Sequence, residues 1–202
     1  GQGHSILNFK MKPDLASTKV EGRTYGLFGF LQNATVENLT IGAPEGDNSE
    51  LTFSADGTTD VGVFTGVIRN STLKNCVNYV PMNVGGNKTD NLRTTMAGFA
   101  GYVISMASEK TVLDNLKNYG SIAGAPGNNT KNGATSVMIA GIAGLAHTNT
   151  SAVGNFITNC DNYGNMTSSV ARASGILAAA QLMTTIENCN NYGDQTNTSS
   201  NY

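Results

Sequence analysis

The chain has 202 residues and a mass of 21.0 kDa, enough for one domain with a sizeable core. Only 13% of the residues are charged and the formal net charge is −2, which excludes the basic surface that nucleic acids or anionic lipids require. No apolar run reaches about 18 residues, so the sequence predicts no direct membrane insertion. Glycine is abundant, with 24 residues, and this favours turns and short strands over helices.

The first recurring element is a tetrad of glycine and apolar residues. Its five copies are GLFG (26–29), GVFT (62–65), GFAG (98–101), GIAG (141–144) and GILA (175–178). Their first residues are separated by 36, 36, 43 and 34 residues, and the second glycine is lost in the second and fifth copies. A fixed order at such a period predicts a repeat architecture in which each repeat stacks on its neighbours.

Each tetrad is followed by an apolar residue, a spacer, an asparagine and then Leu or Cys. The copies are VENL (36–39), LKNC (73–76), LDNL (113–116), ITNC (157–160) and IENC (186–189). The two apolar positions both point inward, which breaks the two-residue alternation of a strand and requires a bend between them. Asparagine suits this bend because it tolerates left-handed backbone. The predicted corner residues are Asn38, Asn75, Asn115, Asn159 and Asn188.

Stacked repeats place equivalent residues above one another at about 4.8 Å, the spacing of neighbouring strands. The corner asparagines are therefore predicted to form a ladder of amide hydrogen bonds. A second ladder, of aromatic rings, is predicted for Tyr79, Tyr119, Tyr163 and Tyr192. Three residues after these tyrosines come Met82, Ile122, Met166 and Gln195. The polar residue in the last copy indicates the final coil, where no neighbour covers an inward side chain.

The apolar segments are about 4–6 residues long, the length of short strands, and each repeat holds about three of them. A propeller blade would need four strands, so we predict an all-β solenoid. It forms a single domain over residues 1–202, with five recognisable coils and an N-terminal partial coil. The repeat cores are expected at about 25–41, 61–82, 96–122, 139–166 and 173–195.

The GLFG, GFAG and GIAG tetrads, with following segments such as IENCNNYGD, resemble the GLUG-motif repeats of bacterial cell-surface and secreted proteins, common in gut Bacteroidetes. The opening GQGHSILNFKM is similar to the first coil that precedes such repeats, so the resemblance covers nearly the whole chain. It implies a right-handed parallel β-helix displayed outside the cell, and it implies no defined activity. The first repeat departs from the pattern because it lacks Asn-Tyr-Gly.

The three cysteines follow corner asparagines, in a column shared with Leu39 and Leu116. Zinc sites need cysteines about two to four residues apart, so Cys76, Cys160 and Cys189 are predicted to fill the core as small apolar residues. An alternative remains for two of them. Cys160 and Cys189 fall in adjacent coils, near enough for a disulfide.

The densest acidic segment, 45–60, holds Glu45, Asp47, Glu50, Asp56 and Asp60. It lacks the ligand spacing of an EF-hand, so we predict a solvated loop, with Ca²⁺ binding as the alternative and no other cofactor. The remaining acids are scattered and predict no catalytic cluster.

The separations between tetrad glycine and corner asparagine are 12, 13, 17, 18 and 13 residues. The two long segments, around 103–111 and 146–156, belong to neighbouring coils and should protrude side by side. Paired insertions on one edge of a solenoid are a common place for a binding surface. The candidate binding residues are Ser108, Glu109, Lys110, His147, Asn149 and Asn155.

We therefore expect a non-enzymatic module at the bacterial cell surface or outside the cell, serving adhesion, glycan contact or structural spacing. Its expected partner is an extracellular glycan or a surface protein of a host or neighbouring cell, and nucleic acid is not expected. One alternative is a β-helical polysaccharide lyase or glycoside hydrolase with catalytic residues that the sequence does not reveal. Another is a stalk segment of a larger adhesin.

Overall fold

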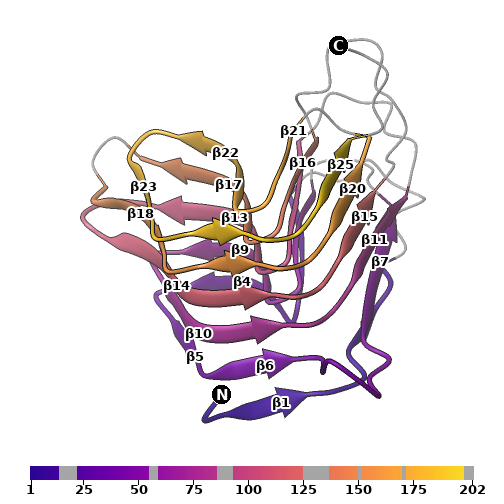
Figure 1. The fold of residues 1–202 in the computed structure, drawn as a ribbon. Helices are drawn as coiled ribbons and strands as arrows, with labels where there is room; N and C mark the ends of the chain where they lie inside the picture. The colour runs from indigo at the N-terminus through magenta and orange to yellow at the C-terminus, as the bar shows by residue number, and fades with distance from the viewer. Residues whose placement is uncertain are drawn as a thin grey trace.

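The computed structural model of the protein describes residues 1–13, 22–54, 59–85, 93–124, 137–149, 152–169 and 172–197. All regular elements in these ranges are β-strands, and the ranges include no helix that could cross a membrane. The strands form four sheets, called A to D here, within which neighbouring strands run parallel. On each turn the chain passes through sheets C, D, A and B in this order (Figure 1).

Sheet A contains β1 (His4–Ile6), β5 (Thr35–Glu37), β6 (Leu39–Ile41), β10 (Thr72–Asn78), β14 (Lys110–Asn118), β18 (Gly154–Thr158), β19 (Asp161–Asn162), β23 (Thr184–Glu187) and β24 (Asn190–Asn191). Sheet B contains β2 (Lys10–Met11), β7 (Glu50–Ser54), β11 (Met82–Gly85), β15 (Ile122–Gly124), β20 (Met166–Ser168) and β25 (Gln195–Asn197). Sheet C contains β3 (Arg23–Tyr25), β8 (Thr59–Gly62), β12 (Thr94–Ala97), β16 (Val137–Ala140) and β21 (Arg172–Ser174). Sheet D contains β4 (Phe28–Gln32), β9 (Thr65–Arg69), β13 (Ala100–Ser105), β17 (Ala143–Thr148) and β22 (Leu177–Gln181).

The molecule is a parallel β-helix, as predicted, with a right-handed winding (Figure 1). β1 and β2 form the N-terminal partial coil, and five coils follow, which begin at β3, β8, β12, β16 and β21. The expected three strands per coil was wrong, because each coil contributes to four sheets. The glycine tetrad spans the turn that joins sheet C to sheet D and runs into the start of the sheet D strand.

The inward column before the corner asparagine was predicted correctly. Leu73 pairs with Val36 on one side and Leu113 on the other, and Ile157 continues the column to Ile186. The three central members are fully buried in the core. Ile186 belongs to the last coil and is 48% exposed, since no described strand covers it.

The tetrads align differently from the sequence-based alignment in the second coil. Gly62 pairs with Ala97, not with Gly98, and Gly66 lies opposite Gly101 between two paired positions. The second glycine is therefore present in this coil, one residue later than the tetrad suggested. It is needed there because a Cβ on Gly66 would lie 2.6 Å from a backbone oxygen of sheet C.

The predicted tyrosine ladder is present on the outside of the corner between sheets A and B. Tyr79 stacks on Tyr119 with 4.9 Å between ring centroids, and Tyr119 stacks on Tyr163 at 4.7 Å. Tyr192 ends the ladder, 4.9 Å from Tyr163, and its ring is 62% exposed. The interplanar angles of 7–14° show nearly parallel rings, as expected for one side chain repeated coil after coil.

A second asparagine ladder, which the sequence analysis missed, lies inside the same corner. Asn78 donates through Nδ2 to Asn118, Asn118 to Asn162, and Asn162 to Asn191, each at 2.7 Å. The last three also donate to the carbonyl oxygen two residues further on, at 2.9–3.0 Å. In the first coil Ile41 takes the position of Asn78, so the ladder starts in the second coil.

The buried asparagines pack directly against the tetrad glycines. A Cβ on Gly141 would lie 2.4 Å from the side-chain amide of Asn162 and 2.2 Å from the carbonyl oxygen of Gly175. A Cβ on Gly98 would likewise lie 2.5 Å from the side-chain oxygen of Asn118. The turn between sheets C and D thus touches the corner between sheets A and B, and the two sequence motifs are partners across the interior.

We predict that Gly141→Ala destabilises the protein by about 2–3 kcal/mol, because the new methyl group has no space beside Asn162 and Gly175. Urea unfolding followed by circular dichroism measures this loss. Gly85→Ala is the matched control, since a Cβ there meets nothing within 4 Å. Equal midpoints for the two variants would contradict the close packing of the two corners.

Candidate functional site

The coils differ in length at the edge where sheet D meets sheet A. Coils 1 and 2 turn this edge tightly, through Asn33 and Asn70 at φ values of 51° and 48°. Coils 3 and 4 carry longer connections, over residues 106–109 and 149–153. This edge, at the left of Figure 1, holds the candidate binding residues of the sequence analysis.

The structure brings the two longer connections together. The backbone N–H of Asn149 donates to the carbonyl oxygen of Ser105 at 3.0 Å, and that of Val153 donates to Glu109 at 3.3 Å. Where the connections end, Lys110 pairs with Gly154 as sheet A resumes. The described parts of the two insertions therefore lie side by side on neighbouring coils.

Asn155 does not belong to this surface, and its prediction as a binding residue was wrong. Its side chain is fully buried. It donates to the carbonyl oxygen of His147 at 2.9 Å and to Thr148 at 3.0 Å, and it accepts from Ser105 at 2.7 Å. Asn155 is a structural residue that holds both insertions on the stack.

A polar hollow of about 460 Å³ lies where the insertion of coil 3 rises above the tight corners of coils 1 and 2. Its lining residues are Asn33, Ala34, Thr35, Asn70, Ser71, Thr72, Glu109 and Lys110. Two of the candidate residues, Glu109 and Lys110, are thus found here, and both are exposed. The hollow presents amides, hydroxyls and one charge of each sign.

A second, smaller hollow of about 240 Å³ lies on the sheet D side of the same edge. It is lined by Ile104, Met106, His147, Thr148, Asn149 and Leu182. His147 and Asn149, two further candidate residues, therefore lie away from Glu109 and Lys110. Ser108 is exposed on the connection of coil 3 and is not among the residues that line either hollow.

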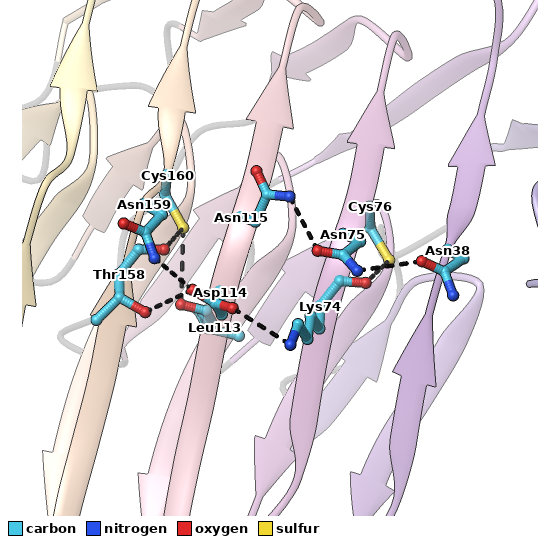
Figure 2. Close-up of polar contacts among 10 residues, drawn as sticks. All are labelled: Asn38, Lys74, Asn75, Cys76, Leu113, Asp114, Asn115, Thr158, Asn159 and Cys160. Atoms are coloured by element: carbon cyan, nitrogen blue, oxygen red, sulfur yellow. Dashed lines mark hydrogen bonds and ion pairs between the residues drawn. The ribbon is translucent and has the colours of Figure 1, made fainter.

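The corner asparagines lie in sheet A, away from both hollows. All five have positive φ, between 51° and 55°. Figure 2 shows the first part of their ladder, in which Asn75 donates to Asn38 at 3.2 Å and Asn115 donates to Asn75 at 2.9 Å. Asn188 donates to Asn159 at 3.3 Å in the last step.

Asp114 interrupts this ladder between coils 3 and 4 (Figure 2). Its carboxylate accepts from Asn159 and Thr158, both at 2.8 Å, and lies 3.9 Å from Lys74. Burial raises the pKa of Asp114, but these hydrogen bonds and the Lys74 charge together hold it below its ordinary value. Asp114, which precedes the corner asparagine of coil 3, thus forms a surface ion pair with Lys74 and links coils 2, 3 and 4.

The acidic segment 45–60 does not converge on one point, as far as the structure describes it. Asp47 accepts from the backbone N–H of Asn8 at 2.6 Å, and Glu50 accepts from Thr52 at 2.5 Å. Asp60 lies in sheet C, and Asp56 is outside the described residues. No group of three His, Cys, Asp or Glu residues that could hold a metal ion occurs in the described ranges.

Asp60 is part of a buried charged cluster that the sequence analysis did not predict. It is 4% exposed, accepts from Arg93 Nη2 at 2.9 and 3.1 Å, and accepts from Thr95 at 2.6 Å. The Arg93 guanidinium lies 4.0 Å from the centroid of the Tyr102 ring. Burial raises the pKa of Asp60 above its ordinary value, against the lowering effect of the Arg93 charge.

We predict that Arg93→Ala costs about 2 kcal/mol of stability at neutral pH, because it leaves the buried Asp60 carboxylate without its cation. Without Arg93 the pKa of Asp60 rises further, so the folded state takes up a proton more readily. The difference from wild type is therefore largest above this pKa and shrinks as the pH falls from about 7 to 4.

Urea unfolding at several pH values measures this effect. Arg69→Ala is the control, because Arg69 donates to the neutral Gln32 and lies over the Phe30 ring at 5.1 Å. Its stability loss should not change over the same range. A loss at Arg93 that stays constant or grows on acidification would contradict the charged pairing.

Comparison with known proteins gives no relative for this chain. No protein-family model, no curated protein and no solved structure matches it. The resemblance to GLUG-motif repeats therefore stays a prediction from the motifs. The feature of this protein that bears on function is the geometry of the edge between sheets D and A.

Proposed function

We propose that the protein is a non-enzymatic β-helical module, at the bacterial cell surface or secreted, that contacts a hydroxyl-rich ligand such as a glycan. The contact surface is the edge between sheets D and A, with the polar hollow at its centre. The observation that carries the proposal is the lining of this hollow, which combines side-chain amides and hydroxyls with the charged residues Glu109 and Lys110.

The chemistry of the lining suits a neutral polyol better than a charged or apolar ligand. Asn33 and Asn70 offer amide donors and acceptors. Thr35 and Thr72, the first residues of β5 and β10, offer hydroxyl groups. Sugar hydroxyls both donate and accept hydrogen bonds, as these groups do. The volume falls within the range of about 300–1,000 Å³ that small-molecule sites occupy, which is enough for part of a saccharide chain.

The walls of the hollow are held in place before any ligand arrives. Asn70 accepts from the backbone N–H of Met106 at 2.9 Å, and its own N–H donates to Thr111 at 2.7 Å. Ser71 accepts from the backbone N–H of Ala34 at 3.0 Å and donates to Arg69 at 2.7 Å. A preorganised surface loses little conformational entropy on binding, which favours weak polar ligands.

The non-enzymatic assignment is supported by the partners of three described carboxylates. Asp60 is neutralised by Arg93, Asp114 links three coils, and Glu50 bonds neighbouring side chains of sheet B. These carboxylates have structural partners and lie on different faces. The extracellular location is supported by the resemblance to GLUG-motif repeats, and the long rigid stack also suits a spacer between such a contact surface and the envelope.

We predict that the protein is retained by glycans on an array of bacterial and host saccharides, and that Glu109→Ala/Lys110→Ala weakens this retention about tenfold or more. The reason is that the double variant removes the two charged side chains that line the hollow together with Asn33 and Asn70. Binding of the strongest saccharide is then measured by titration calorimetry for both proteins.

A matched control exists on sheet B, where Lys10 pairs in register with Glu50 and both are exposed. Lys10→Ala/Glu50→Ala removes the same two charges from another face and should leave binding unchanged. Failure of every saccharide on a broad array would rule out the glycan ligand and leave the spacer role. Equal losses in both double variants would move the site away from the edge.

A further inference from the structure

The inward column after the corner asparagines contains all three cysteines of the chain. Cys76 pairs with Leu116 in the next coil, so no second thiol lies above it. Cys160 and Cys189 lie in adjacent coils, and the backbone N–H of Asn190 donates to the carbonyl oxygen of Cys160 at 3.0 Å. Cys76 and Cys160 are fully buried in the core, as predicted, whereas Cys189 is only partly covered.

The two neighbouring thiols point the same way. Cys160 Sγ lies 3.7 Å from the carbonyl oxygen of Leu113, and Cys189 Sγ lies 3.5 Å from that of Ile157, one coil further on. Strands that pair in parallel are about 4.8 Å apart, within the Cα separation of about 4.4–6.8 Å found in disulfides. Because the two thiols point the same way, disulfide formation requires a rotation of the outer side chain toward Cys160.

The pair is electrostatically unequal. A hydrogen bond from the Cys160 thiol stabilises the Cys189 thiolate and lowers the pKa of Cys189 to about 7, although burial opposes this. The same contact, together with burial, raises the pKa of Cys160 above its ordinary value. The partly buried Cys189 is therefore the partner that more readily becomes a thiolate, and the fully buried Cys160 is the one that keeps its proton.

We propose that Cys160 and Cys189 are an oxidisable dithiol, which a peroxide converts into a disulfide that fastens the last coil to the stack. Hydrogen peroxide first oxidises the Cys189 thiolate to a sulfenic acid, and its O–O bond breaks with release of hydroxide. The Cys160 sulfur then attacks the Cys189 sulfur. The S–O bond breaks, and the leaving hydroxide takes the Cys160 proton to form water.

The position of the pair gives this bond a physical role. The last coil is poorly covered, with Ile186 48% and Leu182 59% exposed. Its strands have neighbours on one side only among the described residues. Such an edge opens more easily than the interior of a sheet. A covalent bond from Cys189 to the fully buried Cys160 holds this coil in place.

The test begins with the full chain, treated with hydrogen peroxide and digested with trypsin without reduction. Arg172 separates the two cysteines in the sequence, so cleavage there puts them on different peptides, 132–172 and 173–202. We expect these peptides to be joined, with a mass two hydrogens below their sum, and to separate on reduction. Cys76→Ala is the control and should leave the link unchanged.

Two variants at one position separate the disulfide from the thiolate. Cys160→Ser keeps a hydrogen-bond donor for Cys189 but cannot form the link, and Cys160→Ala loses both. Alkylation of Cys189 by iodoacetamide should rise through a midpoint near pH 7 in wild type. The midpoint should stay low in Cys160→Ser and move toward the ordinary thiol value in Cys160→Ala.

Oxidation should also slow the cleavage of the last coil by a non-specific protease at least tenfold in wild type and leave Cys160→Ser unaffected. Joined peptides that contain Cys76, or no joined peptides at all under excess peroxide, would overturn the proposal. Equal alkylation midpoints in the serine and alanine variants would show that the Cys160 donor does not activate Cys189.

Discussion

The structure depends on one close contact, in which the buried asparagines of one corner meet the glycines of the opposite turn. Asn162 fills the space beside Gly141, and the same pairing recurs between Asn118 and Gly98. This contact brings four sheets around a narrow interior, because a side chain on either glycine would push the corners apart. The same asparagines also satisfy their buried polar groups, because the amides of Asn78 and Asn118 donate hydrogen bonds to the asparagine of the next coil. The outer ladders and the edge insertions are built on this frame.

The frame explains why the length of the chain can vary at the edge between sheets D and A. Residues in the stacked columns are tied to neighbours above and below, so a change at Leu113 or Tyr119 affects three coils at once. At the edge between sheets D and A, the chain needs only to return to register at Lys110 and Gly154. Segments of different length fit there without disturbing the core. A surface that can change while its support stays fixed is well placed for recognition.

The sequence predicted features that repeat, and it failed where single contacts decide. The columns of Leu113 and Tyr119 were visible because the same residue type recurs at one offset. Asn118 was missed because nothing in its motif distinguishes a buried asparagine from one on the surface. Asp60 and Arg93 are 33 residues apart and come together only because of the register of sheet C. No motif in the sequence indicates that they pair. Asn155 was assigned to the surface because it lies in an insertion, but its side chain is buried and forms hydrogen bonds inside the protein.

The two asparagine ladders run in opposite senses. In the buried ladder, the amide of Asn118 donates toward the C-terminal end of the stack, to Asn162. In the corner ladder, the amide of Asn115 donates toward the N-terminal end, to Asn75. Aligned amides add their dipoles, as peptide units do along an α-helix. Because these two rows oppose each other, the amide dipoles of one row offset those of the other wherever a coil carries both, so such coils can be added without the dipoles of a single row accumulating along the stack.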